Sequence, residues 1–126
     1  MPGDSSRLRT TVIRTSEAAR DEFDWGSTSW CINGAAGNSD SLTLGKVIIR
    51  SGASNPKHGH ANCDEILYLL SGELEHYADD METVRMQPGD VIFIPGGVCH
   101  WARCVSAEDA EMIVVYSSPE REIELA

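Results

Sequence analysis

The stretch of sequence that decides the fold is GASNPKHGHANCDEILYLLSG, residues 52–72. Two of the four histidines in the chain, His58 and His60, stand one residue apart here, and Glu65 opens an apolar run. In an extended segment, side chains two residues apart point to the same side, so we expect His58 and His60 to be co-facial. A glutamate at the head of an apolar strand is costly to bury without a partner.

A fourth candidate, His100, follows PGDVIFIPGGVC, in which we predict a strand, a Pro-Gly-Gly turn and the start of another strand. Three imidazoles and one carboxylate suit one divalent transition metal such as Mn, Fe, Co, Ni, Cu or Zn. A lone strand histidine, or a histidine pair in a loop, usually ligates nothing. The four residues together, with their glycine and proline punctuation, favour a metal site formed by His58, His60, Glu65 and His100.

Turn signals divide the rest of the chain into short runs rich in branched and aromatic residues. The pattern predicts an all-β domain, an antiparallel sandwich or barrel. Only SEAARDEF, residues 16–23, is compatible with a helix, and an irregular arm is the alternative. We therefore expect an N-terminal arm over residues 1–25 and a barrel over residues 26–126. The predicted strands are 42–50, 65–70, 73–77, 83–86, 90–95, 100–105 and 111–118.

The composition narrows the classes of partner. A formal net charge of -10 disfavours nucleic acid and anionic membrane surfaces. No apolar run approaches the roughly 20 residues that span a bilayer. The N-terminal sequence lacks the apolar core of a signal peptide, so we expect a cytoplasmic protein. In that compartment the four cysteines are expected to be free thiols rather than two disulfides: Cys31, Cys63, Cys99 and Cys104.

Two motifs, separated by residues 73–88, resemble the conserved motifs of the cupins, with matching order and internal spacing. They read Gly52-x5-His58-x-His60-x4-Glu65-x6-Gly72 and Gly89-x5-Pro95-x-Gly97-x2-His100. The resemblance implies a single small antiparallel barrel of the double-stranded β-helix, jelly-roll type. It also implies one divalent metal (Fe, Mn, Ni or Zn) held inside by the two histidines of the first motif, its glutamate, and His100.

Two further residues are weak catalytic candidates. Where the cupin motif usually has asparagine, four positions after His100, this chain has Cys104. Strand parity puts Cys104 on the face of His100, although a buried cysteine acting as a small hydrophobic residue is the commoner case. His76 shares parity with Leu74 and could act as a general acid or base beside the metal. A partly exposed strand histidine is the commoner alternative.

Other polar and aromatic residues could contribute to substrate binding or serve only packing and solubility. Lys46 and Arg50 lie on the strand that enters the site, and either could hold a substrate carboxylate or belong to a solvated face. Trp25, Trp30 and Trp101 are interpreted as core or interface aromatics. The segment 65–70 is apolar on both sides, which predicts a second sheet or a second subunit behind it; with the cupin resemblance, this leads us to expect a homodimer.

Three functions remain open. A redox-active metal such as Fe(II) or Mn(II) would give a dioxygenase-type oxidoreductase acting on a small oxygenated molecule, the alternative we favour. A non-redox metal would give an isomerase, epimerase or lyase on a sugar acid or carbonyl compound. The third is a small-ligand or metal-binding protein without catalysis. A complete set of four ligands favours an enzyme with a small-molecule substrate, and no nucleotide-binding loop is present.

Overall fold

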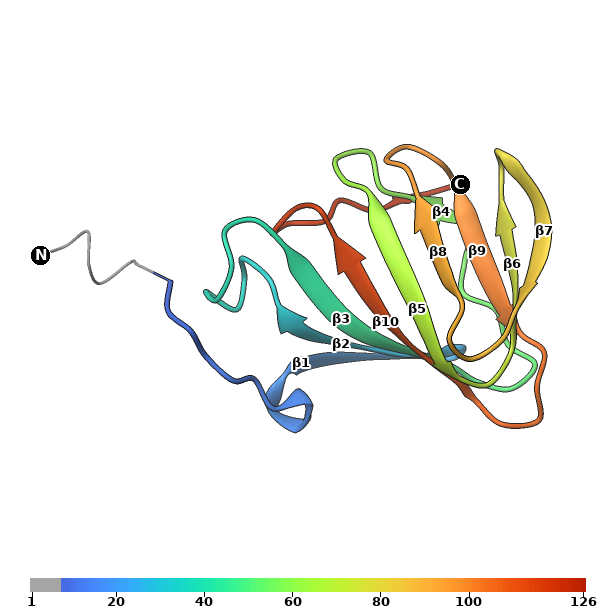
Figure 1. Ribbon diagram of the computed structural model, residues 1–126, viewed down its shortest axis with the longest axis horizontal. Coiled ribbons are helices and arrows are strands. Elements are labelled where there is room, and N and C mark those ends of the chain that lie inside the picture. Colours follow the sequence, from blue (N-terminus) through green and yellow to red (C-terminus); the bar gives the residue numbers. More distant parts are fainter. Residues whose placement is uncertain (1–7) are drawn as a thin grey trace, which may run out of the picture.

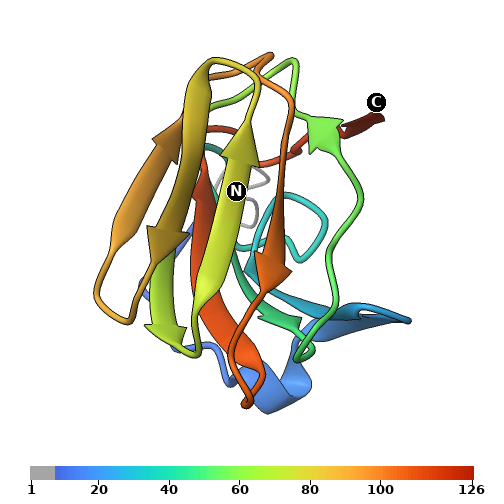
Figure 2. The ribbon, with the colours of Figure 1, turned by 90° about the vertical axis from the view of Figure 1, so that its right-hand side faces the viewer.

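The protein is described by a computed structural model over residues 8–126, and it consists of two antiparallel sheets that face each other (Figures 1 and 2). The first sheet has the strand order β1 (Ala19–Phe23), β2 (Gly26–Ile32), β3 (Thr43–Ile49), β10 (Ala110–Tyr116), β5 (Glu65–Ser71) and β8 (Val91–Ile94). The second sheet has the order β11 (Glu124–Leu125), β4 (His58–Gly59), β9 (His100–Cys104), β6 (Leu74–Ala78) and β7 (Met81–Met86). The predicted all-β architecture is confirmed.

Each of the seven predicted strands is present, but the helix considered for residues 16–23 is wrong, as is an irregular arm there. A short 3-10 helix, η1 (Thr15–Glu17), precedes β1, and β1 pairs with β2 from Ala19 opposite Trp30 to Phe23 opposite Gly26. All side chains of β1 are exposed, so backbone pairing with β2 decides its conformation rather than a buried apolar face. The expected boundary between an N-terminal arm (residues 1–25) and a barrel (residues 26–126) stays a prediction. β1 lies within the residues assigned to the arm.

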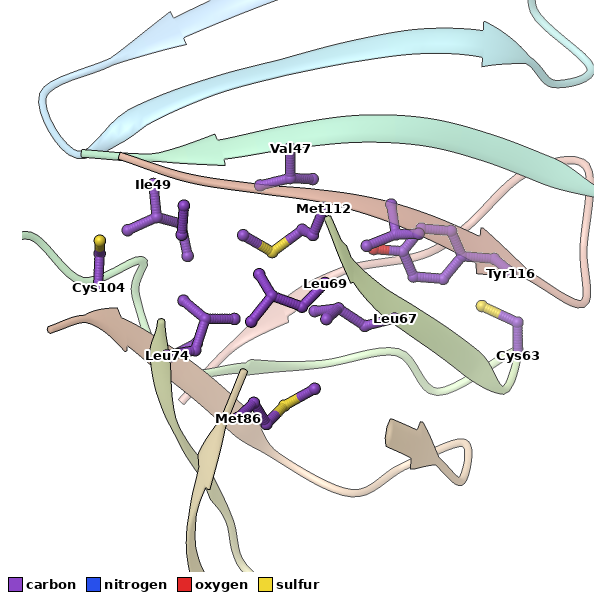
Figure 3. Packing of buried hydrophobic residues seen from close by; sticks show 13 residues of the cluster. Val47, Ile49, Cys63, Leu67, Leu69, Leu74, Met86, Cys104, Met112 and Tyr116 are labelled. Carbon is purple, nitrogen blue, oxygen red and sulfur yellow. The ribbon is translucent and has the colours of Figure 1, made fainter. Parts of the chain in front are cut away.

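Strict alternation along the strands of the first sheet builds the interior. In β5, Leu67 and Leu69 are buried and point between the sheets, while Ile66, Tyr68 and Leu70 alternate outward. The second sheet contributes the opposing side of the core, where Leu74 lies in β6. Figure 3 shows Leu67, Leu69 and Leu74 packed between the two sheets.

The turn between β5 and β6 depends on a glycine. Gly72 adopts φ 77°, a conformation that side-chain-bearing residues rarely take. A Cβ at this position would also lie 2.7 Å from the Cα of Ala110. The second glycine of residues 52–72 therefore has a structural reason: it lets β5 turn sharply into the second sheet beside β10.

The outer face of the first sheet is apolar and exposed over β5 and β8. Its exposed side chains include Ile66, Tyr68, Leu70, Val91 and Phe93, of which Phe93 is 59% exposed. Cross-strand register brings Ile66 opposite Phe93 and Tyr68 opposite Val91, so these side chains form one continuous surface. The second sheet that was expected behind 65–70 covers only the inner face.

The structure also describes the state of the cysteines and the helices of the chain. The four cysteines are all free, which agrees with the expectation of thiols rather than disulfides. Among residues 8–126 there is no helix with the length and apolar character needed to cross a membrane.

Candidate metal centre

The four predicted ligands converge from both sheets. His58 in β4 lies directly opposite His100 in β9, His60 immediately follows β4, and Glu65 is the first residue of β5 in the facing sheet. One ligand atom from each of the four residues lies within 4.8 Å of all the others, and all four residues are buried. They could therefore bind one divalent metal.

The polar atoms at the centre are placed better for binding a metal than for hydrogen bonding to one another. Glu65 Oε1 lies 3.3 Å from His60 Nε2 and 3.2 Å from His100 Nε2. None of these three buried atoms has a hydrogen bond of good geometry. Buried polar atoms without partners are costly, and a cation placed between imidazole nitrogens and a carboxylate would satisfy all three.

Backbone carbonyl groups fix the orientation of two of the imidazoles. His58 Nδ1 lies 2.7 Å from the Pro56 carbonyl oxygen, and His60 Nδ1 lies 2.8 Å from the Glu122 carbonyl oxygen. A carbonyl oxygen only accepts, so each Nδ1 carries the proton and each Nε2 keeps its lone pair. This is the arrangement of metal-ligating histidines with outer partners that set the tautomer.

The protonation states suit a metal centre as well. Burial alone would raise the pKa of Glu65, but the adjacent His100 and His60 outweigh burial and hold its pKa at about 2. Burial lowers the pKa of His58 to about 4. A neutral imidazole and an ionised carboxylate are the forms that bind a metal, and both are favoured near neutral pH.

The centre opens into a cavity of about 360 Å³ between the sheets. Val47, Leu67 and Val114 are among its apolar walls, while Trp25 and Trp30 add aromatic surface. The volume lies near the lower end of the range of small-molecule sites, about 300–1,000 Å³. A small, largely apolar molecule could therefore reach His58, Glu65 and His100, the three candidate ligands that line the cavity.

Two residues missed by sequence reasoning lie in this cavity. Tyr116, at the end of β10, packs edge-on against the ring of His60 with centroids 4.9 Å apart. Burial and the negative charge of Glu65 raise its pKa well above the ordinary value, so its hydroxyl is protonated. Arg121 lies in the C-terminal segment and also lines the cavity. Alternation within 111–118 could have placed Tyr116 inside, but no local pattern identifies Arg121.

The two weak catalytic candidates have different surroundings. His76 is buried and lines the cavity, with its ring stacked on His100 at 5.4 Å between centroids and 12° between planes, so partial exposure was the wrong alternative. Its Nδ1 has no hydrogen-bond partner among the described residues. Cys104 shares the inward face of β9, but its thiol lies 3.3 Å from the Glu108 carbonyl oxygen and within the hydrophobic core. That is the environment of a packing residue.

The two basic residues considered as substrate anchors both point away from the site. Lys46 forms an ion pair with Glu111 on the outer face of the first sheet, and Arg50 lies 3.8 Å from Glu22. The tryptophans also divide, since Trp25 and Trp30 line the cavity, whereas Trp101 stacks on Tyr77.

Comparison with known proteins agrees with this geometry. The family description "Cupin domain" matches residues 45–116, more than half of the chain, so the protein belongs to the cupin domain family. An uncharacterized protein of Streptomyces coelicolor, SCO3923, is 32% identical over 79 residues, which are 63% of this chain and 72% of that protein.

Two named enzymes are similar to the chain over different lengths. The dimethylsulfoniopropionate lyase DddQ of Ruegeria pomeroyi is 32% identical over 105 residues, 75% of this chain, and the match spans about half (52%) of the lyase. A structure of Lactobacillus farciminis oxalate decarboxylase with formate superposes with a TM-score of 0.79 at 20% identity. It covers 87% of this chain and 34% of that chain, and at this identity the likeness shows the fold alone.

Proposed function

We propose that the protein is a divalent-metal-dependent enzyme that acts on a small oxygenated organic molecule, with His58, His60, Glu65 and His100 as the metal ligands. The observation that carries the proposal is the convergence of four buried ligand atoms within 4.8 Å, several without hydrogen bonds, at the wall of a cavity. A bound transition metal would supply Lewis acidity and, if it is redox-active, the capacity to exchange electrons.

Backbone carbonyl groups and cavity-lining side chains make the site suitable for metal-dependent chemistry. The Pro56 and Glu122 carbonyls hold two imidazoles with Nε2 available, as described above. Apolar walls keep water from the substrate and strengthen the electrostatic interactions inside. His76 lies beside the ligands without being one of them, so it is the residue that we propose for contact with the reacting part of the substrate.

For the reaction itself, we propose a dioxygenase-type oxidation supported by Fe(II) or Mn(II). Imidazole and carboxylate ligands, as supplied by His58, His60, Glu65 and His100, suit these ions. A non-redox reaction of the lyase or isomerase class is the second candidate, because a relative 32% identical to the chain is named a lyase.

Oxygen consumption separates these reactions. Protein loaded in turn with Fe, Mn, Ni and Zn is mixed with enols, diols, hydroxy acids and sugar acids in an oxygen electrode and, in parallel, under anaerobic conditions. Oxidation requires oxygen uptake equal to substrate loss and no anaerobic turnover. Anaerobic turnover with Zn or Ni would contradict oxidation and favour the lyase or isomerase. The absence of turnover with every metal and substrate would favour a binding protein without catalysis.

We also propose that the protein is a cytoplasmic homodimer whose interface is the outer face of the first sheet, the surface of Ile66, Tyr68 and Phe93 described above. Exposed apolar patches of this kind mark interaction sites. Phe93→Lys should convert the dimer to a monomer in analytical ultracentrifugation, whereas Val12→Lys, a change at an exposed residue outside this face, should not. A monomeric wild-type protein at micromolar concentration would contradict the dimer.

A further inference from the structure

We propose that the molecule bound in the cavity carries a carboxylate and that Arg121 binds it, with the apolar body of the molecule on the aromatic walls. This inference rests on the proposed function and names the substrate class of the same site. Its starting point is the stacking of Arg121. The guanidinium carbon lies 4.2 Å from the ring centroid of Trp30 and 5.5 Å from that of Tyr116, and the residue lines the cavity.

Arg121 is one of four basic residues within 8–126 that have no acidic partner, and it is the one of these four that lines the cavity. Five others form ion pairs with carboxylates: Arg20, Lys46, Arg50, Lys57 and Arg85. Within residues 8–126, no carboxylate pairs with Arg121 and no side-chain hydrogen bond uses its donors, although Glu120 and Glu122 are its neighbours in sequence. A half-buried arginine beside a cavity therefore keeps its binding capacity for another molecule.

The cation–π contact with Trp30 and Tyr116 leaves the N–H donors of Arg121 free. Cation–π contact uses the flat faces of the guanidinium group. The N–H donors point outward along the edges of the same plane, in the fork that matches the two oxygens of a carboxylate. Trp30 and Tyr116 thus contact the Arg121 guanidinium group without accepting a hydrogen bond from its donors.

The backbone on either side of Arg121 is tied to the loop that carries the metal ligands. Asn62, between His60 and Glu65 in sequence, donates from Nδ2 to the Glu120 carbonyl oxygen at 2.6 Å and accepts from the Glu122 N–H at 2.8 Å. The Glu122 carbonyl oxygen also accepts from His60. Arg121 therefore has a fixed position relative to the metal ligands, which a residue on a free tail would not have.

Charge within the cavity favours an anion although the protein as a whole is acidic. Glu65 is the one acidic residue among those that line the cavity, and a divalent ion bound to it would outweigh its charge. Arg121 adds a second positive group. The aromatic wall formed by Phe23 and Trp25, whose rings are stacked 4.9 Å apart, receives an apolar body rather than a second charge.

Binding of matched acids and amides tests the proposal. The probes are benzoate with benzamide and phenylacetate with phenylacetamide, measured by calorimetry and tryptophan fluorescence on metal-free and Zn-loaded protein. We expect each acid to bind about tenfold or more tightly than its amide, because a charge-assisted bidentate contact is lost in the amide. The preference should persist without metal, since it comes from Arg121.

Three variants assign the preference to one side chain. Arg121→Gln should abolish it, and Arg121→Lys should restore part of it, because a lysine keeps the charge but not the fork. Arg103→Gln, at an exposed arginine outside the cavity, removes the same charge and should change nothing. Circular dichroism checks that each variant is folded. Equal binding of acid and amide by the wild type, or an undiminished preference in folded Arg121→Gln, would overturn the proposal.

The result is independent of catalysis. An Arg121-dependent preference for acids in protein that turns over no substrate would support this inference and contradict the proposed enzyme. Metal-dependent turnover in a protein that binds acids and amides equally would do the reverse.

Discussion

The two ends of the interior are built by the same strands and have opposite chemistry. On the inward face of β5, Glu65 lies at one end and Leu69 at the other, and on the inward face of β9, His100 and Cys104 are separated in the same way. Figure 3 shows the hydrophobic core along this direction, with Cys63 and Tyr116 on one side and Ile49, Cys104 and Leu74 on the other. Tyr116 pairs with Glu65 and contacts His60, so its side is the one near the metal ligands.

Strand alternation therefore decides only which side chains point inward. What they do there depends on the partners that the facing sheet supplies. At the apolar end the partners are aliphatic, and burial itself stabilises the fold. At the metal end the buried groups are ionisable, and burial is costly until their charges and lone pairs are matched by a partner.

The largest effect should come from the apolar end. Leu74→Ala removes most of a fully buried side chain and should lower the free energy of unfolding by about 2–5 kcal/mol. Urea denaturation measures the loss. The number of metal ions bound per folded chain should not change, because Leu74 is not one of the cavity-lining residues. A loss of metal binding in this variant, while it is still folded, would contradict the separation of the two ends.

Metal should stabilise the protein through the other end. At a free metal concentration of about 100 times Kd, binding to the folded state alone adds about 2.7 kcal/mol to the free energy of unfolding. Thermal melts with and without Zn should show this gain in the wild type and equally in Leu74→Ala. His100→Ala should lose it. A His100→Ala protein that Zn stabilises as much as the wild type would show that the metal binds elsewhere.

Acid should lower the free energy of unfolding of the metal-free protein by protonating the buried histidines at the metal end. Burial lowers the pKa of His58 and of His76 from 6.5 to about 4. Between these values the unfolded chain binds more protons than the folded one, so the stability present above pH 6.5 falls as the pH drops towards 4. The loss should be roughly 1–2 kcal/mol for each histidine at pH 5. Denaturation at pH 7, 6 and 5 measures it, and His76→Phe should remove the share of His76. Constant stability from pH 7 to 5 would contradict the buried neutral histidines.

The smallest effect should come from Cys104. Cys104→Ala removes one buried sulfur atom and should cost about 1 kcal/mol of unfolding free energy. Metal binding and any catalytic rate should remain at the wild-type level, because the thiol contacts a loop carbonyl rather than the cavity. A large loss of rate in a variant with normal stability would restore Cys104 as a catalytic residue.

Much of the site could be predicted from sequence because its information is local. His58, His60 and Glu65 lie within a few residues of one another, and parity along β5 gave the inward direction of Leu67 and Leu69 correctly. The position of His100 followed from a turn that glycine and proline mark clearly.

The rest depended on pairings between distant segments. β1 and β2 carry no strong alternation, and their strands exist because β2 pairs with β3 in the first sheet. Arg121 reaches the cavity only because Asn62 and His60 hold the C-terminal backbone, which no property of residues 117–126 indicates. His76 was underrated for a similar reason, since its burial depends on stacking against His100 from the neighbouring strand.

Metal stoichiometry is the most direct test of the account. Wild type, His100→Ala and the control Cys104→Ala are each dialysed to equilibrium against Mn, Fe, Co, Ni or Zn, and bound metal is measured by mass spectrometry. We predict that the wild type and Cys104→Ala each bind about one ion per chain for at least one of these metals. In His100→Ala the affinity should fall about a hundredfold or more, beyond the loss of about 10–100-fold that is typical when only an outer hydrogen-bond partner of a ligand is changed. No binding of any of these metals by the wild type, or equal affinity in folded His100→Ala, would contradict it.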